Sequence, residues 1–243
     1  MAIAIGPPTT GAGAVSDPAS TLPESPASSS KRPAPISWDY DRGELIADGV
    51  VHVIGVALGL IGAVAIILVA IELKRIGVTP VVIYAVGLLA MLGLSAAYNM
   101  WPISPTKWIL RRFDHSAIYL LIASTYTPFL AAMKATLATA ALGVGVWVSA
   151  AIGMLLKLVW PGRFDGFAVV LCLLLGWSGV VAYESMMSLP SVSLWLLAAG
   201  GVLYSVGTIF HLWQRLRFHN AIWHGFVLAA AGCHYSAVLT CVT

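Results

Sequence analysis

Charged side chains are scarce in this sequence. Asp, Glu, Lys and Arg make up 9% of the 243 residues, whereas hydrophobic residues make up 59% and the mean hydropathy is +0.90. Water-soluble domains contain about 25% charged residues, so the composition excludes an ordinary soluble globular protein. We therefore expect a multi-pass integral protein of the cell membrane.

Cysteine is also scarce, and large apolar residues are nearly missing from the N-terminal region. Cys172, Cys233 and Cys241 have neither the spacing of a zinc site nor that of a disulfide framework, so we interpret them as small apolar residues of helices. The start of the chain is rich in Ala, Pro and Ser and cannot bury enough surface to offset its conformational entropy. The sequence predicts a disordered cytoplasmic tail over residues 1–43 and a membrane domain over residues 44–243.

Seven apolar stretches follow the tail. A helix that crosses a bilayer needs about 20 predominantly apolar residues, and charged residues and Pro/Gly clusters divide the chain into stretches of that length. The predicted fold is therefore all-α, an integral membrane bundle of seven transmembrane helices. Their expected ranges are 49–71, 80–101, 114–133, 135–156, 166–184, 191–213 and 221–241.

Lysine and arginine are distributed unevenly over the predicted loops. Ten lie on the side of the tail, whereas the opposite side has only Lys74, Arg75 and Lys134. Cytoplasmic loops are enriched in these residues, so we expect the N-terminus in the cytoplasm and the C-terminus outside. The basic residues are spread along loops next to the membrane, so the expected partners are membrane lipids and not nucleic acid.

The few polar side chains of the spans gather at one depth. They lie within about two turns of the cytoplasmic ends of four predicted spans. Residues four apart share a helix face, and ionisable groups inside a membrane bundle usually face its interior. Side chains that meet in this way can bind a metal ion or activate a water molecule. The residues of this layer are His52, Ser95, Asn99, Asp114, His115, Asn220 and His224.

Two members of this layer also have simpler explanations. Asp114 follows Arg111 and Arg112, so it could pair with an arginine or cap the third helix. His115 is one residue further along, about 100° around the helix. That direction favours a position for His115 at the membrane interface or around the metal ligands, rather than among them.

Four stretches together resemble a known family. They are "ELIADGVVHVIG" (44–55), "SAAYN" (95–99), "RRFDHSAIYLLIASTYTPF" (111–129) and "NAIWHGFVLAAAGCHYSAVL" (220–239). In this order they resemble the hemolysin III family, the bacterial branch of the progestin and adipoQ receptor group. That group belongs to a superfamily that includes the alkaline ceramidases. The resemblance implies seven spans with the N-terminus inside, in agreement with the pattern of spans and basic residues.

The resemblance also implies a zinc site. In the family, three histidines bind the ion, two of them one turn apart on the seventh span, and an Asp and a Ser lie near the metal-bound water. The matching positions make Asp114 and Ser95 the catalytic residues and His224 a metal ligand. The other two ligand positions are occupied by Asn99 and Asn220, and amide oxygens are poor zinc ligands.

These departures leave two interpretations of the site. His52, His115 and Asp114 could replace the missing imidazoles and form a weaker or different metal site. Alternatively, the two asparagines, His224 and Asp114 could form a hydrogen-bond network without a metal, linking the second, third and seventh spans. Asp48, one turn before His52, stands where the family is expected to have Asn.

Two functions are consistent with these residues. One is a metal-dependent hydrolase of a membrane lipid, such as a lipid amide, in which Asp114 is the general base and Ser95 positions the water or polarises the substrate carbonyl. The other is a non-catalytic membrane sensor or a pore-associated protein of cytolysin type with a degenerate metal site. A channel needs polar groups through the whole depth of the bilayer. The outer halves of these spans have few.

Overall fold

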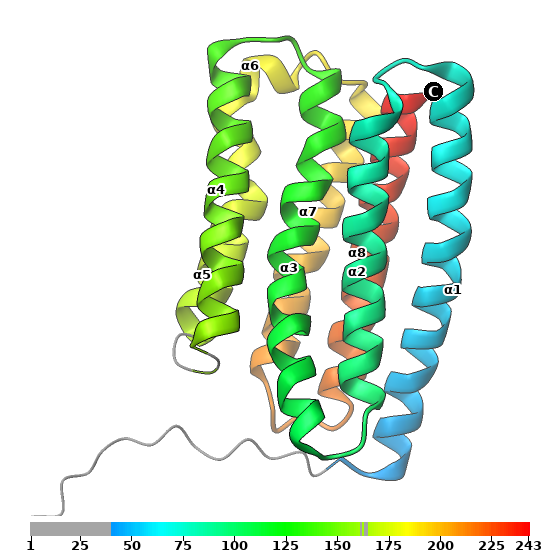
Figure 1. Cartoon of the computed structure of the whole chain (residues 1–243), viewed down its shortest axis with the longest axis vertical. Coiled ribbons are helices and arrows are strands. Elements are labelled where there is room, and N and C mark those ends of the chain that lie inside the picture. Colours follow the sequence, from blue (N-terminus) through cyan, green and yellow to red (C-terminus); the bar gives the residue numbers. More distant parts are fainter. Residues whose placement is uncertain (1–39, 161, 163–164) are drawn as a thin grey trace, which may run out of the picture. The chain divides into compact units, whose positions relative to one another are not determined.

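Long helices joined by short connections form the part of the chain that the structure describes, residues 40–160, 162 and 165–243. Within these residues the computed structural model contains helices and no strands (Figure 1). Of the predicted disordered tail, residues 1–43, the part up to residue 39 lies outside the described residues, whereas Arg42 and Gly43 already belong to the first helix, which Asp41 caps. The helices are α1 (Arg42–Leu73), α2 (Val78–Met100), α3 (Pro105–Ala132), α4 (Leu137–Val159), α5 (Asp165–Trp177), the 3-10 helix η1 (Ser178–Ala182), α6 (Tyr183–Met186), α7 (Ser191–Leu212) and α8 (His219–Val242).

Six segments of the described chain are long and apolar enough to cross a membrane. The chain is thus an all-helical, multi-pass membrane protein, as its composition predicts. α3 has 28 residues and the necessary length, but it is more polar than the other long helices. The six segments are Arg42–Leu73, Val78–Met100, Leu137–Val159, Gly166–Met186, Ser191–Leu212 and His219–Val242.

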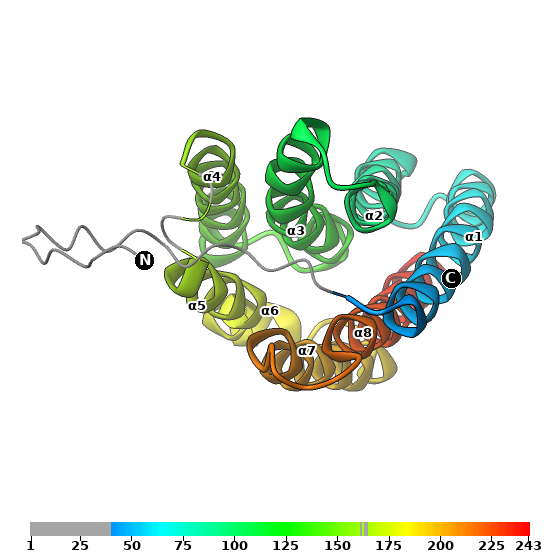
Figure 2. The ribbon, with the colours of Figure 1, turned by 90° about the horizontal axis from the view of Figure 1, so that it is seen from below.

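α3 is polar because protein surrounds it. Figure 2 shows α1 to α4 in one arc and α5 to α8 in a second arc facing it. α3 lies between α2 and α4 in the first arc and also contacts α5 and α8 of the second. Its buried residues include Lys107, Arg111, Ser124 and Thr125. A helix enclosed by its neighbours can hold polar side chains that a lipid-facing helix excludes. Mean hydropathy alone is therefore a poor measure of whether α3 can cross a membrane.

The outer surface of the bundle is apolar. Monomeric soluble proteins rarely expose contiguous apolar patches larger than a few hundred Å², whereas here large hydrophobic side chains are exposed along whole helices. This surface is suited to contact with lipid tails. Examples are Leu58, Ile61, Val64 and Leu68 on α1 and Val144, Val148, Ile152 and Leu155 on α4.

Capping residues set the starts of three helices. Asp41 and Glu44 form a capping box at α1, in which Glu44 N–H donates to Asp41 Oδ1 at 2.8 Å and Asp41 N–H donates to Glu44 Oε2 at 2.9 Å. Ser104 caps α3, with Pro105 at the first helical position, and Thr136 caps α4. The third helix therefore begins well before the predicted start at 114, and Ser104, not Asp114, caps it.

The predicted fifth span is broken. α5 ends at Trp177, and η1 and α6 continue the segment to Met186. The Tyr126 hydroxyl, from α3, accepts from Gly179 N–H at 2.8 Å and donates to Gly176 O at 2.9 Å. Backbone groups at membrane depth must be satisfied inside the protein because lipid tails offer no hydrogen bonds. Tyr126 supplies these partners where the α-helical pattern stops.

Glycine allows the closest approach of α2 to α3. A Cβ atom added at Gly87 would collide with the Ser124 side chain, which is fully buried. A Cβ atom added at Gly93, on the same helix, would meet nothing within 4 Å. The two glycines of α2 thus have different roles, and only Gly87 sets the spacing of α2 and α3.

We expect Gly87→Ala to lower the free energy of unfolding by about 1–3 kcal/mol, because the added methyl group overpacks the α2–α3 contact. Gly93→Ala should leave it unchanged or raise it by about 0.5–1 kcal/mol, because it removes a flexible residue from a helix. Thermal unfolding in detergent measures both variants. An equal loss in the two would contradict the close packing of α2 on α3 at Gly87.

Candidate functional site

Most basic side chains of the described residues lie at one end of the bundle, which we call the basic end. It is formed by the starts of α1, α3, α5 and α8 and the ends of α2, α4 and α7 (Figure 1). The polar layer that the sequence predicts lies at this end. The basic residues there are Arg42, Lys107, Arg111, Arg112, Lys157, Arg215 and Arg217.

The inner face of α1 carries the first two polar residues of the site. Its buried positions recur every three or four residues, as expected for one face of a helix. The stripe begins with Asp48 and His52 at the basic end and continues with small side chains that let α2 and α8 approach. Its members are Asp48, His52, Gly55, Gly59, Ala63, Ile66 and Ala70.

The Asp48 carboxylate is the centre of the site, and Asp48 is 4% exposed. His224 Nδ1 lies 2.6 Å from Asp48 Oδ1 and donates to it, since an ionised carboxylate can only accept. Asn220 Nδ2 donates to Asp48 Oδ2 at 3.0 Å. His52 Nε2 lies 3.5 Å from the same oxygen. Asp48 thus joins α1 to α8 through side chains at two successive turns of α8.

The two asparagines are engaged in hydrogen bonds. Asn220 Nδ2 also donates to Asn99 Oδ1 at 3.1 Å, and Asn99 Nδ2 donates to Ser95 O at 2.9 Å. Both neighbours of the Asn220 nitrogen are oxygen acceptors, so the amide must present its NH₂ group to them. The asparagines therefore form a chain from α2 to α8 that ends on Asp48. The predicted metal-free network includes both asparagines, and the structure shows a hydrogen bond between them. The acid at the centre of the observed network is Asp48, whereas the predicted network had Asp114.

Asp114 and Ser95 face each other across α2 and α3. The Asp114 carboxylate is near the Ser95 hydroxyl, and His224, His52 and Arg111 also contribute to its electrostatic surroundings. The Asp114 side chain is 14% exposed. His115 Nε2 lies 4.0 Å from Asp114 Oδ2. The structure thus brings together the acid and the hydroxyl that the resemblance makes catalytic.

A small cavity lies between α1, α2 and α8 beside these residues. Its volume of about 20 Å³ is enough for one water molecule or one ion. His52, Ser95 and His224 line its polar part, and the ring centroids of the two histidines are 4.4 Å apart. Val51 and Gly55 of α1 also line it, and four larger apolar residues lie one turn deeper in the bundle. They are Met91, Leu92, Val227 and Leu228.

An exposed contact next to the site holds the start of α1 to the start of α8. Arg217 Nη2 donates to Asp41 Oδ2 at 3.0 Å. The hydrogen bond from Glu44 N–H, together with Arg217, lowers the pKa of the Asp41 carboxyl. Tyr40 packs against His219 with ring centroids 5.9 Å apart, and burial raises the pKa of the Tyr40 hydroxyl to about 12. Tyr40 is therefore neutral and Asp41 charged at physiological pH.

The side chains do not fit the three-histidine zinc site that the resemblance implies. Asn220 directs its amide nitrogen, which cannot bind a metal, toward Asp48 and Asn99. A different set does fit a divalent ion, because donor atoms of Asp48, His52 and His224 lie within 4.8 Å of one another. His52 Nε2 is buried and has no hydrogen-bond partner.

Comparison with known proteins places the chain in a family, because the model of haemolysin-III-related proteins matches residues 45–235. The chain belongs to the haemolysin-III-related family. It is 38% identical over 199 residues to "Hemolysin-3 homolog" from Bacillus subtilis, covering 81% of this chain and 93% of that protein. It is 34% identical over 202 residues to "Hemolysin-3" from Bacillus cereus, covering 81% and 90%. The human "Monocyte to macrophage differentiation factor" is 28% identical over 162 residues, covering 64% and 67%.

In this haemolysin-III-related chain, the sequence pattern did not predict that Asp48 belongs to the site. The pattern pairs Asp48 with His52 on one helix face, but it gives no sign that His224 and Asn220 both bind the carboxylate. The acid one turn before a histidine, within an apolar stretch, was the sequence feature that could have indicated it. His115, expected at the interface or around the ligands, lies beside Asp114 and Tyr98, and its ring centroid is 6.2 Å from that of Tyr98.

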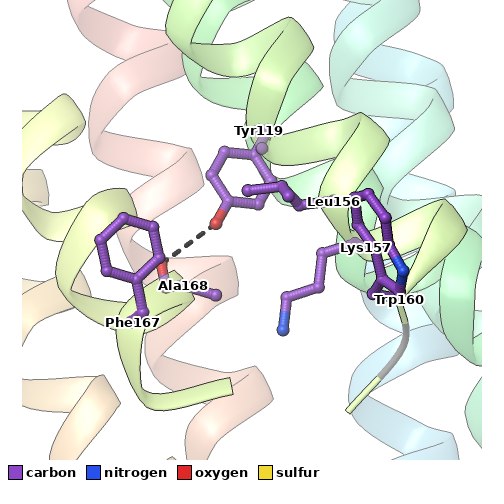
Figure 3. Close-up of a pocket in the computed structure, with 7 residues that line it drawn as sticks. Tyr119, Leu156, Lys157, Trp160, Phe167 and Ala168 are labelled. Carbon is purple, nitrogen blue, oxygen red and sulfur yellow. Dashed lines mark hydrogen bonds between the residues drawn. The ribbon is translucent and has the colours of Figure 1, made fainter. Parts of the chain in front are cut away.

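A second pocket at the basic end offers no comparable chemistry. It lies among α3, α4 and α5, and Figure 3 shows Lys157 extending between Trp160 and the residues of α5. Tyr119 closes it by donating to Ala168 O at 3.2 Å. Its volume is about 10 Å³, and its lining residues include no carboxylate and no histidine. The Asp48 site is therefore the candidate functional site.

We expect Asp48→Ala to destabilise the protein by about 3–5 kcal/mol, because it leaves His224 and Asn220 without their buried acceptor. Glu72→Ala is the matched control, since Glu72 is an exposed acid on the same helix. Its effect should stay within about 0.5 kcal/mol. Thermal unfolding in detergent gives both values. Similar small changes in the two variants would show that Asp48 is not the structural centre of the site.

Proposed function

We propose that this haemolysin-III-related protein is a metal-dependent membrane hydrolase that cleaves a lipid amide bond, as in a ceramide. One observation supports this most. Asp114 faces Ser95, and Ser95 also lines the cavity that borders His52 and His224. A hydroxyl and two imidazoles therefore line a space for one small molecule, and an acid lies next to the hydroxyl. Hydrolysis by an activated water needs such groups close together.

The roles of the side chains follow from their positions. Asp114 accepts a proton from the water that adds to the amide carbonyl carbon, and it then donates this proton to the nitrogen as the C–N bond breaks. The Ser95 hydroxyl, between Asp114 and the cavity, orients the water or the carbonyl oxygen. An ion on Asp48, His52 and His224 would supply Lewis acidity that polarises the carbonyl. The products are a fatty acid and an amine.

The lining of the cavity favours a lipid over a soluble substrate. Its polar residues lie near the basic end, and one turn deeper Met91, Leu92, Val227 and Leu228 offer an apolar path for an acyl chain. The cavity of about 20 Å³ holds no lipid as it stands. Substrate binding therefore requires the Leu92 and Leu228 side chains to move apart.

The proposed membrane topology has seven spans. In it α3 crosses the membrane and the N-terminus is in the cytoplasm. α1 begins and α8 ends at opposite ends of the bundle, and α3 runs alongside α2 and α4 (Figure 1). The basic end carries most of the lysine and arginine, which favours the cytoplasmic side. The substrate amide would then be cleaved at the inner leaflet.

Labelling of single cysteines tests this topology. In a background without Cys172, Cys233 and Cys241, the exposed positions Thr106 and Ala135, near the two ends of α3, are changed to Cys. We expect a membrane-impermeant maleimide to label Ala135→Cys in intact cells and Thr106→Cys only after permeabilisation. Labelling of both from the same side would contradict a crossing by α3, and the reverse pattern would contradict the orientation.

An amidase assay tests the reaction. We expect the purified protein to release fatty acid from a short-chain ceramide in mixed micelles. Asp114→Asn should lower turnover by about 10²–10⁴-fold, because the general base is lost. Glu184→Gln makes the same chemical change at an exposed position far along the chain and should leave turnover within about twofold. Turnover that survives Asp114→Asn would refute the mechanism.

The second candidate is a non-catalytic protein with a structural polar site. The hydrogen-bond chain through Asn99, Asn220 and Asp48 favours it, because these groups are already satisfied without a substrate. Under this alternative the wild-type protein shows no turnover of ceramide or of other N-acyl lipids, and Asp114→Asn changes nothing in the assay.

A further inference from the structure

We propose that Asp48, His52 and His224 bind one divalent transition-metal ion, and that Asn220 positions the Asp48 carboxylate for it. This deepens the proposed function, which needs a metal ion, but it names a ligand set different from the three histidines that the resemblance implies. Two of its members, Asp48 and His52, belong to α1 and not to α2 or α8. The proposal rests on four features of the site.

The first feature is the distance between donor atoms. Two ligands on one zinc ion, with bonds of 2.0–2.2 Å, lie roughly 3.3 Å apart. One ring nitrogen faces each oxygen of Asp48, His224 Nδ1 at 2.6 Å and His52 Nε2 at 3.5 Å. All three donors fall within 4.8 Å. Small shifts of side chains, with no movement of a helix, would bring them around one ion.

The second feature is an unsatisfied buried nitrogen. His52 is 6% exposed, and its Nε2 atom has no hydrogen-bond partner. A buried polar atom left in this state costs about 1–3 kcal/mol, and native proteins rarely keep one without a reason. The atom points toward Asp48 and the cavity. A bound ion would satisfy it.

The third feature is the open space next to the ligands. The cavity of about 20 Å³ borders both histidines and has Ser95 in its wall. Catalytic metal sites combine three protein ligands with an open position, and two histidines with one carboxylate form such a set in zinc hydrolases and in non-haem iron proteins. Three donors beside a cavity of this size match that design.

The fourth feature is the support of the carboxylate. Ligating carboxylates are themselves held by hydrogen bonds, and loss of such a partner lowers metal affinity by about 10–100-fold. Asn220 donates to Asp48 Oδ2 at 3.0 Å and is itself anchored on Asn99. The asparagines thus hold one ligand in place from positions where the resemblance expects imidazoles.

Metal binding by the purified full-length protein tests the proposal. The protein is stripped with a chelator, and the bound ions are counted after dialysis against Zn²⁺, Mn²⁺ or Co²⁺, with Co²⁺ absorption reporting the ligand geometry. We expect one ion per chain. His52→Gln, His224→Gln and Asp48→Asn should each weaken binding by roughly 100-fold or more, and Asn220→Ala by about 10–100-fold. His211 is an imidazole at the same end of the bundle whose ring lies at a tilt against Trp223, and His211→Gln should bind like the wild type.

Stability measurements separate ligand loss from misfolding. His52→Gln removes a nitrogen that has no hydrogen bond, so the metal-free variant should unfold at the same temperature as the metal-free wild type. The wild type should gain stability when the metal is added, because only the folded state has the site, and His52→Gln should not. This comparison holds even if Asp48→Asn fails to fold.

Three results would overturn the proposal. They are absence of a bound ion in the wild type, metal binding that survives His52→Gln, and loss of binding in Asn99→Ala as large as in His224→Gln. The proposed reaction can fail independently. Stoichiometric metal without lipid amidase activity would leave this ligand set in place and refute the hydrolase. Amidase activity in a protein that binds no metal would overturn the ligand set and the metal dependence, and it would leave only the cleavage of the amide.

Discussion

A buried carboxylate holds the side chains at the basic end of this protein together through its hydrogen bonds. Asp48 is 4% exposed in a bundle with an apolar outer surface, where an uncompensated charge is expensive. His224 and Asn220 of α8 both donate hydrogen bonds to Asp48, so α1 packs on α8 in the register that supplies these partners. Asn99 of α2 joins the network through Asn220. Because one acid links α1 to α8, the geometry of the site and the packing of these helices cannot vary independently.

The same constraint explains how polarity is distributed over the helices. α1 and α4 face lipid and expose large aliphatic side chains, whereas α3 is enclosed and holds Lys107, Arg111, Ser124 and Thr125. The Tyr126 hydroxyl on α3 also satisfies backbone groups of the broken fifth segment. α3 is thus the polar helix of the bundle, and it places Asp114 next to the buried Ser95.

The amide side chains of this haemolysin-III-related protein determine which groups of the site can bind a metal ion. At positions 99 and 220 the chain has amides, and an amide nitrogen donates to a carboxylate but does not bind a metal. The acid at position 48 accepts that hydrogen bond and brings a negatively charged donor toward His52 and His224. The group of side chains that could hold a metal ion therefore consists of Asp48 and His52 on α1 and His224 on α8, and it lies beside the cavity and the Asp114–Ser95 pair.

Hydropathy, helix periodicity and the spacing of charged residues are local properties of the chain, so they were enough to establish the membrane class, the helical fold and the grouping of polar residues near one end of the helices. The seven expected ranges fall on described helices, but α1 begins at Arg42 and α3 at Pro105, ahead of the predicted starts at 49 and 114, and the fifth segment is broken. Six segments of the described residues, α3 not among them, are apolar enough to cross a membrane. The family motifs also located Ser95, Asp114 and His224. Three-dimensional packing was needed to show that Asp48 is the centre of the site, that Asn220 points its nitrogen at Asp48, and that His52 Nε2 has no hydrogen bond. These facts depend on the rotation of α1 against α8, and that rotation is set by packing between residues about 170 positions apart in the chain, which no local pattern contains.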